Sequence, residues 1–302
     1  MRFRGLGDMG KELEQAYDHC QRIAKENARN FYYAFRILPA RKRRAIYAAY
    51  AFCRLCDDIS DDDLPLEEKD RQFAETRQHL ADSRDGRATG PIFRAIGDAS
   101  NAFNIPFRYY EEVIEGVEMD LTKTRFADFD ELKDYCYKVA SVVGLICIEV
   151  FGYDDDKARE YAVDMGLAMQ LTNILRDVKE DAERGRIYLP QDEMARFAYT
   201  EQDLMNGVFN DSFRALMAFQ VDRARTYYEK SRRLFPLIHA EARACPSVLH
   251  ATYSGVLDRI EASGYNVFER RIGLSKPAKL LLVARLWAGT LLPSVPIPLL
   301  RR

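Results

Sequence analysis

Apolar residues recur along this chain at spacings of three and four, the pattern of helices that bury one face. Val139, Val143, Ile146 and Val150 are one example, within a long span that contains no proline. The period-two alternation that would indicate strands is weak around the main apolar runs. The pattern therefore predicts an all-α protein, with prolines near the helix ends. The expected helices are 8–28, 40–62, 67–82, 91–102, 106–118, 128–151, 155–184, 209–242, 246–264 and 275–290.

Length and composition fit one helical domain. The chain has 302 residues, of which 47% are hydrophobic, so it can bury a sizeable core. No long or biased linker divides it, and we expect a single domain over residues 1–302. The formal net charge of −2 argues against nucleic acid as a partner, because proteins that bind nucleic acid are usually basic.

The sequence predicts a cytoplasmic protein, because no secretion signal opens the chain and no apolar stretch is clearly long enough to span a bilayer. The apolar C-terminal segment, 280–302, comes closest. Arg285 and three prolines interrupt it, and two arginines close it. Its simpler interpretation is a last core helix with a tail. The alternative is a peripheral contact with the inner face of the membrane.

Cysteines and histidines offer no metal site. The six cysteines lie mostly inside apolar helical patterns, which indicates reduced thiols. Cys53 and Cys56 have the spacing of a redox or zinc motif, but no second pair or nearby histidine completes it. None of the four histidines has metal-ligand spacing to another. We therefore expect any metal to be held by carboxylates.

The first of two acidic clusters comprises Asp57, Asp58 and Asp61. Asp57 and Asp61 share a helix face and lie about 6 Å apart along the helix axis. Carboxylates at this separation repel one another unless a cation lies between them. Pro65 follows, so the cluster sits near a helix C-terminus, where the helix dipole disfavours negative charge.

The second cluster forms a stripe on one face of a later helix. Asp177 and Asp181 are four residues apart, and Gln170 and Asn173 precede them on the same face. Gly185 follows, which places this cluster near a helix C-terminus as well. Each cluster therefore contains two aspartates four residues apart near a helix C-terminus.

The position of the clusters favours a functional interpretation over a pair of solvated helix faces. A sequence shaped only for stability would place lysine or arginine at these helix ends. The run Asp154-Asp155-Asp156, by contrast, precedes a helix, where acids act as ordinary caps. Clustered oxygen ligands indicate Mg²⁺, which takes one or two carboxylates and completes its shell with water and phosphate oxygens. Mn²⁺ can use the same ligands. The clusters therefore predict a magnesium–diphosphate site.

Several ordered motifs surround the clusters. They are Phe31-Tyr32-Tyr33-Ala34-Phe35 with Leu38-Pro39, Tyr50-Ala51-Phe52-Cys53-Arg54, Glu115-Gly116-Val117-Glu118-Met119-Asp120-Leu121, Tyr135-Cys136-Tyr137-Lys138-Val139-Ala140, Gln170-Leu171-Thr172-Asn173-Ile174-Leu175-Arg176-Asp177, Gly185-Arg186-Ile187-Tyr188-Leu189-Pro190 and Asn266-Val267-Phe268. With them the chain resembles the squalene/phytoene synthase family of head-to-head prenyl synthases. The resemblance implies a single-domain, all-α class I isoprenoid synthase fold, a helical bundle around a central apolar cavity. It also implies a prenyltransferase that joins two identical allylic diphosphates.

The resemblance also implies roles for individual residues. The implied metal ligands are Asp57, Asp58, Asp61, Asn173, Asp177 and Asp181. The basic positions expected near diphosphate oxygens, where arginine suits bidentate binding, are Arg54, Arg176, Arg186 and Arg271. The polar positions that line the cavity, with catalytic roles, are Tyr137, Gln170 and Tyr253. Tyr188 joins the expected substrate contacts. Each arginine could instead pair with the acids, and each tyrosine could be a buried hydrogen-bonding group.

Three further positions bear on the substrate. The family often has a small hydroxyl residue directly before the Phe-Tyr motif, near the diphosphate, whereas this chain has Asn30, whose amide could still donate a hydrogen bond. Phe35 and Tyr47 lie on the helices that border the hydrocarbon end of the family's pocket. Both are bulky, which favours C15 over C20 prenyl chains. The alternative is that both only pack in the core.

We therefore expect presqualene diphosphate, a squalene and hopanoid precursor, to form from two farnesyl diphosphates. The segment 259–266 also resembles bacterial presqualene diphosphate synthases. The alternatives are phytoene synthase, which would join two geranylgeranyl diphosphates, and dehydrosqualene or squalene synthase. A second ionisation could end by proton loss or by hydride from NADPH, so NADPH use stays open, although the expected product does not require it. Downstream enzymes of hopanoid or carotenoid synthesis are candidate partners.

Two other classes of function remain at this point. A class I terpene cyclase would also carry acidic clusters, but the late motifs argue against it. A non-catalytic helical assembly factor would be favoured if either cluster had lost its acids, and here both are intact.

Overall fold

The regular elements in the described part of the chain are helices, which confirms the all-α expectation. The structure is a computed structural model that describes residues 6–273, without the side chains of 6–9, 29 and 30. Within that range the helices are α1 (Leu6–Asn27), α2 (Arg29–Phe35), α3 (Ala40–Asp61), α4 (Leu66–Arg84), α5 (Pro91–Phe103), α6 (Phe107–Thr122), α7 (Phe129–Cys136), η1 (Tyr137–Ser141), α8 (Val142–Phe151), α9 (Lys157–Glu183), α10 (Gln191–Arg196), α11 (Glu201–Met205), α12 (Asp211–Ser231), η2 (Arg232–Leu237) and α13 (Ala244–Ala262).

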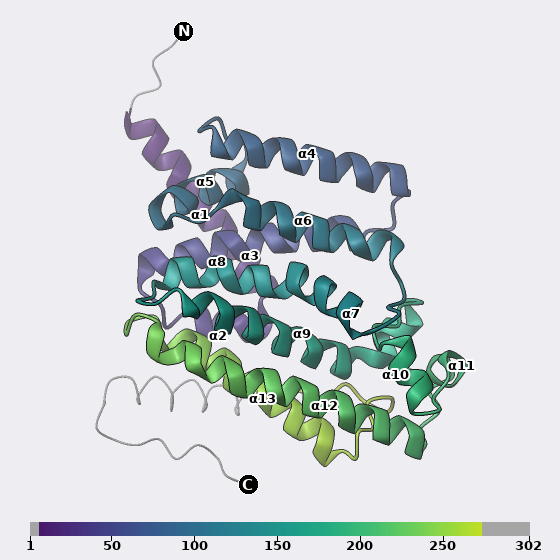
Figure 1. Cartoon of the computed structure of the whole chain (residues 1–302). Coiled ribbons are helices and arrows are strands. Elements are labelled where there is room, and N and C mark those ends of the chain that lie inside the picture. Colours follow the sequence, from purple (N-terminus) through teal and green to yellow (C-terminus); the bar gives the residue numbers. More distant parts are fainter. Residues whose placement is uncertain (1–5, 274–302) are drawn as a thin grey trace.

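Two helices form the centre of the bundle. α3 is buried on nearly every side between Ala45 and Phe52, as expected of a helix whose apolar residues surround its axis. α9 packs against α8, η1, α12 and α13. Figure 1 shows most of the long helices lying across the bundle in similar directions, with α1 oblique to them and α10 and α11 gathered at one end.

The buried side chains form two groups. One lies mainly on α1, α3, α5, α6 and α8, and the other mainly on α7, α9, α12 and α13. Phe31, Val163 and Met169 are partly buried and contact both groups. The boundary between the two groups therefore runs along α9, and the candidate site lies there.

The expected helices differ from the structure mainly in three ways. The helix expected over 209–242 ends at Ser231, because Pro236 has no N–H to donate, and a 3₁₀ helix, η2, takes the chain onward. The sequence also missed three short helices, α2, α10 and α11. The expected helix 128–151 is interrupted by the π-helical turn η1. The expected helix 275–290 lies outside the described residues, as does most of the apolar segment 280–302.

The π-helical turn is held between two close helix approaches. A Cβ on Gly116 of α6 would lie 2.7 Å from Lys138 Cβ, and a Cβ on Gly166 of α9 would lie 2.4 Å from Ser141 Cα. Ser141 Oγ also donates to the Val163 carbonyl at 2.8 Å. Both glycines therefore let the backbone of η1 pack directly between α6 and α9.

We expect Gly166→Ala to lower the free energy of unfolding by about 1–3 kcal/mol, because its methyl group would overpack against the η1 backbone. The new Cβ would meet Ser141 N at 2.7 Å and Ala140 O at 2.8 Å, and backbone atoms cannot rotate away. Denaturant unfolding followed by circular dichroism measures the change. Gly10→Ala in α1 is the matched control, since open space surrounds Gly10. An equal loss in both variants would contradict this account.

Candidate active site

The first acidic cluster lies in the last turns of α3, as the sequence predicted. Asp58 is ion-paired with Arg54, one turn earlier on the same helix. Asp61 Oδ1 lies 3.8 Å from Arg184 Nη1 and 4.0 Å from Arg186 Nη1. Because both arginines directly follow α9, the ends of α3 and α9 lie next to one another.

The stripe on α9 combines amide, acid and arginine groups. Asn173 Nδ2 donates to Gln170 Oε1 at 3.2 Å. Asp177 accepts hydrogen bonds from Arg176 Nε at 2.8 Å and from Arg271 Nε and Nη2 at 3.0 and 3.1 Å. Burial opposes ionisation of Asp177, but the hydrogen bond and charge of Arg176 outweigh it and lower the carboxyl pKa. Asp177 is therefore an ionised group held between two cations.

A cavity of about 290 Å³ runs between α3 and α9. Asp57, Gln170 and Asn173 line one end, which brings the two acidic clusters to one opening. Ile46 on α3 and Ala162 on α9 line the other end, each eleven residues earlier and therefore about 16 Å along its helix. The side chains between the ends are mostly apolar. They include Phe31, Phe35, Ala49, Val139, Val143, Cys147, Ile148, Met165 and Met169.

The carboxylates at the opening destabilise one another's charge. Solvent reaches Asp57, but the surrounding protein and then Asp61 raise the pKa of Asp57 to about 7. Burial and then Asp177 raise the pKa of Asp181 to about 7. A divalent cation would stabilise such a set of oxygen ligands, so the residues fit Mg²⁺. Within residues 6–273, no three His, Cys, Asp or Glu side chains converge closely enough to hold a metal ion by themselves.

A hydrogen-bonded carboxylate beside the opening was not singled out from the sequence. Asp120, near the end of α6, accepts from Tyr188 Oη at 2.9 Å and from Tyr135 Oη at 3.0 Å. Arg186 Nη2 donates to the Asp120 carbonyl at 3.3 Å. Asp120 and Tyr135 both belong to family motifs, so the sequence marks both residues. The spacing of residues along the chain does not predict that their side chains meet.

The family model for squalene/phytoene synthase matches residues 24–278 of this chain. The chain belongs to the squalene/phytoene synthase family. It is accordingly a prenyltransferase, and the reaction of its family is the head-to-head condensation of two prenyl diphosphates. This conclusion favours an enzyme over a non-catalytic assembly factor.

Relatives and solved structures agree with this assignment. The 15-cis-phytoene synthase of Synechocystis sp. is 38% identical, covering 91% of this chain and 85% of the relative. The phytoene synthase of Mycobacterium tuberculosis is 37% identical, covering 92% and 93%. The crystal structure of a dehydrosqualene synthase superposes with a TM-score of 0.85 at 30% identity, covering 93% and 98%. The crystal structure of the squalene synthase of Alicyclobacillus acidocaldarius superposes with a TM-score of 0.80 at 28% identity, covering 85% of this chain and 98% of the other.

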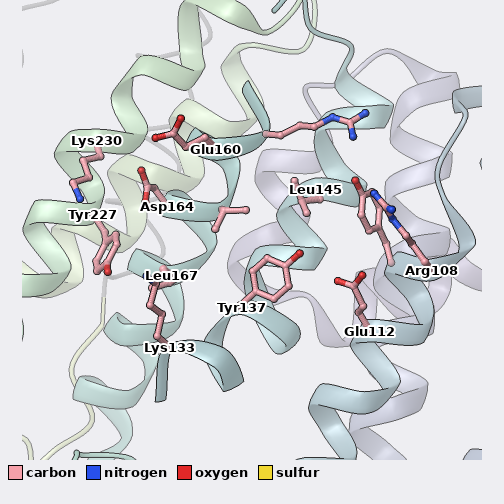
Figure 2. Close-up of a pocket in the computed structure, with 13 residues that line it drawn as sticks. Arg108, Glu112, Lys133, Tyr137, Leu145, Glu160, Asp164, Leu167, Tyr227 and Lys230 are labelled. Carbon is pink, nitrogen blue, oxygen red and sulfur yellow. The ribbon is translucent and has the colours of Figure 1, made fainter. Parts of the chain in front are cut away.

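Tyr137 does not line the cavity, contrary to the expectation from the family motif. It lines a separate groove between α6, α9 and α12, where Figure 2 shows it close to Glu112 and across from Lys133 and Asp164. Two residues along a helix turn the side-chain direction by about 200°. Because Tyr135 points toward Asp120, Tyr137 points away from it. Burial and then Glu112 raise the pKa of the Tyr137 hydroxyl.

The two bulky residues expected at the hydrocarbon end occupy different positions. Phe35 lines the cavity, with its ring centroid 5.9 Å from that of Phe31. Tyr47 is not in the wall. It lies behind Phe35 at 6.2 Å between centroids and stacks on Tyr32 at 5.9 Å. Tyr47 therefore supports the position of Phe35 instead of facing the cavity.

The remaining expected site residues lie around the opening or behind the wall. Tyr253 is buried, with its ring 5.6 Å from Phe31, which lines the cavity. Burial raises the pKa of Tyr253 to about 12, and the nearby Arg176 partly opposes this shift. Tyr188 belongs to the network around Asp120. The backbone of Asn30 is in α2, but its side chain lies outside the described residues.

Among residues 6–273, the helices are all too short or too polar to cross a membrane.

Proposed function

We propose that this protein condenses two molecules of farnesyl diphosphate head to head and releases presqualene diphosphate and pyrophosphate. The choice of C15 substrates rests on one observation: the ring of Phe35 forms part of the cavity wall, with Tyr47 packed behind it. A rigid aromatic pair at this position shortens the room for a prenyl chain, because buried rings cannot move without disturbing close-packed neighbours. C15 chains are therefore favoured over C20 chains.

We assign diphosphate binding to the opening where the two acidic clusters meet. The proposed ligands for Mg²⁺, or for Mn²⁺ in its place, are Asp57, Asp58, Asp61, Asn173, Asp177 and Asp181. Bound magnesium would neutralise charge on the leaving diphosphate and so lower the barrier to C–O cleavage. Arg54, Arg176, Arg186 and Arg271 would hold diphosphate oxygens, to which the planar guanidinium group binds in bidentate fashion. Asn30 is the remaining proposed donor there.

The apolar cavity would protect the reaction after ionisation. Loss of pyrophosphate from one farnesyl diphosphate leaves an allylic cation, which water would quench, and the lining excludes water. The double bond of the second substrate attacks the cation, and loss of one proton closes the cyclopropane ring. The proton acceptors available at the opening are the pyrophosphate oxygens and the Asp120 network. Gln170 and Tyr253 are proposed to orient the reacting chains. Tyr137, which lines the groove in Figure 2, would act only indirectly.

Incubation with Mg²⁺ and labelled farnesyl or geranylgeranyl diphosphate, with and without NADPH, tests the proposal. We expect farnesyl diphosphate to give presqualene diphosphate in both conditions, because the condensation transfers no hydride. Dephosphorylated products are separated by chromatography and identified by mass. Turnover of the C20 substrate alone would overturn the chain length, and a product formed only with NADPH would overturn release at presqualene diphosphate.

Phytoene synthesis from two geranylgeranyl diphosphates is the second candidate. It is favoured by relatives named phytoene synthase that are 36–38% identical to this chain. Dehydrosqualene and squalene synthesis are further alternatives, because solved structures similar to this chain carry those names. The same incubation separates all of them by product mass.

We further propose that residues 1–302 act as one domain in the cytoplasm, with segment 280–302 touching the inner face of the membrane. The thirty-carbon hydrocarbon part of presqualene diphosphate supports this arrangement, because downstream enzymes of hopanoid or carotenoid synthesis would receive it at a lipid surface. Flotation with anionic vesicles, comparing the full chain with a variant ending at residue 279, measures the contact.

A further inference from the structure

A cation lies near the end of the cavity that is remote from the acidic clusters, which is called the closed end below, and it lies outside the proposed diphosphate site. Lys42 lies in the first turn of α3, and its side chain is only 15% exposed. Its Nζ donates to the Phe151 carbonyl at 2.6 Å and to Glu241 Oε1 at 2.8 Å. Phe151 ends α8, and Glu241 lies in the turn before α13. One ammonium group therefore connects three segments that are far apart in the sequence.

The local geometry explains why a cation belongs there. The last carbonyls of a helix lack intrahelical partners and carry the negative end of its dipole, so the Phe151 carbonyl favours a positive donor. Gly152 then turns the chain with a φ of +75°, and a Cβ there would lie 2.3 Å from His239 Nδ1. His239 N donates to the Gly152 carbonyl at 3.0 Å, and Asp154 N donates to the Leu237 carbonyl at 3.1 Å. The loop after α8 is therefore hydrogen-bonded through its backbone to the segment at the end of η2 and just after it.

The helices that Lys42 contacts, and the elements on either side of the turn that holds Glu241, form part of the cavity wall. Ile46 lies one turn after Lys42 on α3 and lines the cavity, as does Phe151 itself. Leu234 precedes the turn that holds Glu241, and Leu249 follows it, and both also line the cavity. Figure 1 shows α3 beginning and α8 ending at the same end of the bundle, opposite α10 and α11. The contacts of Lys42 therefore lie directly behind the closed end.

We propose that Lys42 is a positioning residue that fixes the closed end of the cavity and so limits the length of the prenyl chain that binds. The inference rests on the proposed function, because it concerns the same cavity. Without the ammonium group, the Phe151 carbonyl loses the Lys42 donor, and the end of α8 loses its side-chain link to the turn before α13, which leaves only the backbone hydrogen bonds of Gly152 and Asp154 there. The wall at Phe151 and Leu234 can then move outward and admit additional carbon atoms.

The test compares binding of C15 and C20 prenyl thiolodiphosphates, which resist ionisation, to the full chain with Mg²⁺. Calorimetry gives the ratio of the two dissociation constants, C15 over C20, for the wild type and each variant. Lys42→Met keeps the length of the side chain but removes its hydrogen-bond donors. We expect the ratio to rise about tenfold, which means relatively tighter binding of C20. An apolar pocket discriminates by about 10–200-fold for each methylene group, so this change is within its range. Lys42→Arg keeps a charged donor and should restore a ratio near that of the wild type.

Arg44→Met is the matched control on the same helix. Arg44 pairs with Glu14 at 2.9 Å and lies 4.3 Å from the centre of the Tyr17 ring, away from the cavity wall. It should reduce thermal stability without changing the ratio. A purely structural role for Lys42 predicts the same behaviour in Lys42→Met, so this result would overturn the proposal.

The other outcomes distinguish failure of the proposed function from failure of the role assigned to Lys42. If the wild type binds neither analogue, the proposed function fails and the inference about Lys42 fails with it. If the wild type binds them and the ratio in Lys42→Met is unchanged, the proposed function stands and the role of Lys42 is wrong. Should Lys42→Met not fold, Glu241→Gln replaces it, because that variant keeps the bond to the Phe151 carbonyl. A smaller shift toward C20 would then support the proposal, and an unchanged ratio would overturn it.

Discussion

Asp177→Ala should reduce turnover of prenyl diphosphates by about 10³-fold or more while leaving the helical circular dichroism signal intact. In the structure, Asp177 accepts hydrogen bonds from Arg176 and Arg271. In the proposed complex it would help to hold a metal ion that neutralises the diphosphate. Removing it takes away charge stabilisation in the transition state, and single groups of this kind are worth about 10²–10³ in rate. Loss of the ordered arginines would add to this effect.

The control for Asp177→Ala is Asp155→Ala, which lies two residues before the start of the same helix. Asp155 Oδ1 accepts from Lys157 N at 2.9 Å, which is the local contact of a helix start. This variant should lose some stability and keep its turnover. Both are measured as initial rates of pyrophosphate release at saturating Mg²⁺. Activity that survives in Asp177→Ala would show that the second acidic cluster is not the diphosphate site.

The sequence was sufficient for the fold class and for the position of the acidic clusters. Periodic apolar residues and prolines located most long helices, because a helix that buries one face needs apolar residues three and four positions apart. Asp61 ends α3, and Asp181 lies in the last turn of α9. Both clusters therefore lie at helix C-termini, as predicted. The meeting of the two helix ends, through Asp61 and Arg186, depends on tertiary packing and could only be inferred from the family resemblance.

The directions of single side chains could not be predicted with the same success. Tyr135 and Tyr137 belong to one motif, yet only Tyr135 points toward the opening, and the π-helical turn that begins at Tyr137 leaves no clear mark in the sequence. Tyr47 was expected in the cavity wall but packs behind Phe35. Both cases turn on a rotation of about 100° per residue, so a small error in register moves a side chain to another face.

Chelation of divalent cations should abolish turnover in the wild-type protein, and added Mg²⁺ should restore it. The diphosphate would otherwise approach Asp57, Asp61 and Asp177, and like charges a few ångströms apart repel strongly in a partly buried site. The arginines at the opening are already engaged with these acids, Arg186 with Asp61 and Arg271 with Asp177. They therefore offer less free positive charge to the substrate than their number suggests.

The expected loss in EDTA is at least about 10³-fold, since a cation that neutralises a leaving diphosphate contributes several kcal/mol. Mn²⁺ should restore much of the activity, because it accepts the same oxygen ligands. Ca²⁺ should restore little, since it is larger and takes more ligands in a looser geometry than Mg²⁺. That comparison keeps the charge constant and changes only size and geometry, so equal rates with Ca²⁺ and Mg²⁺ would mean that screening alone is needed. Full activity in EDTA would instead mean that the arginines alone stabilise the leaving group.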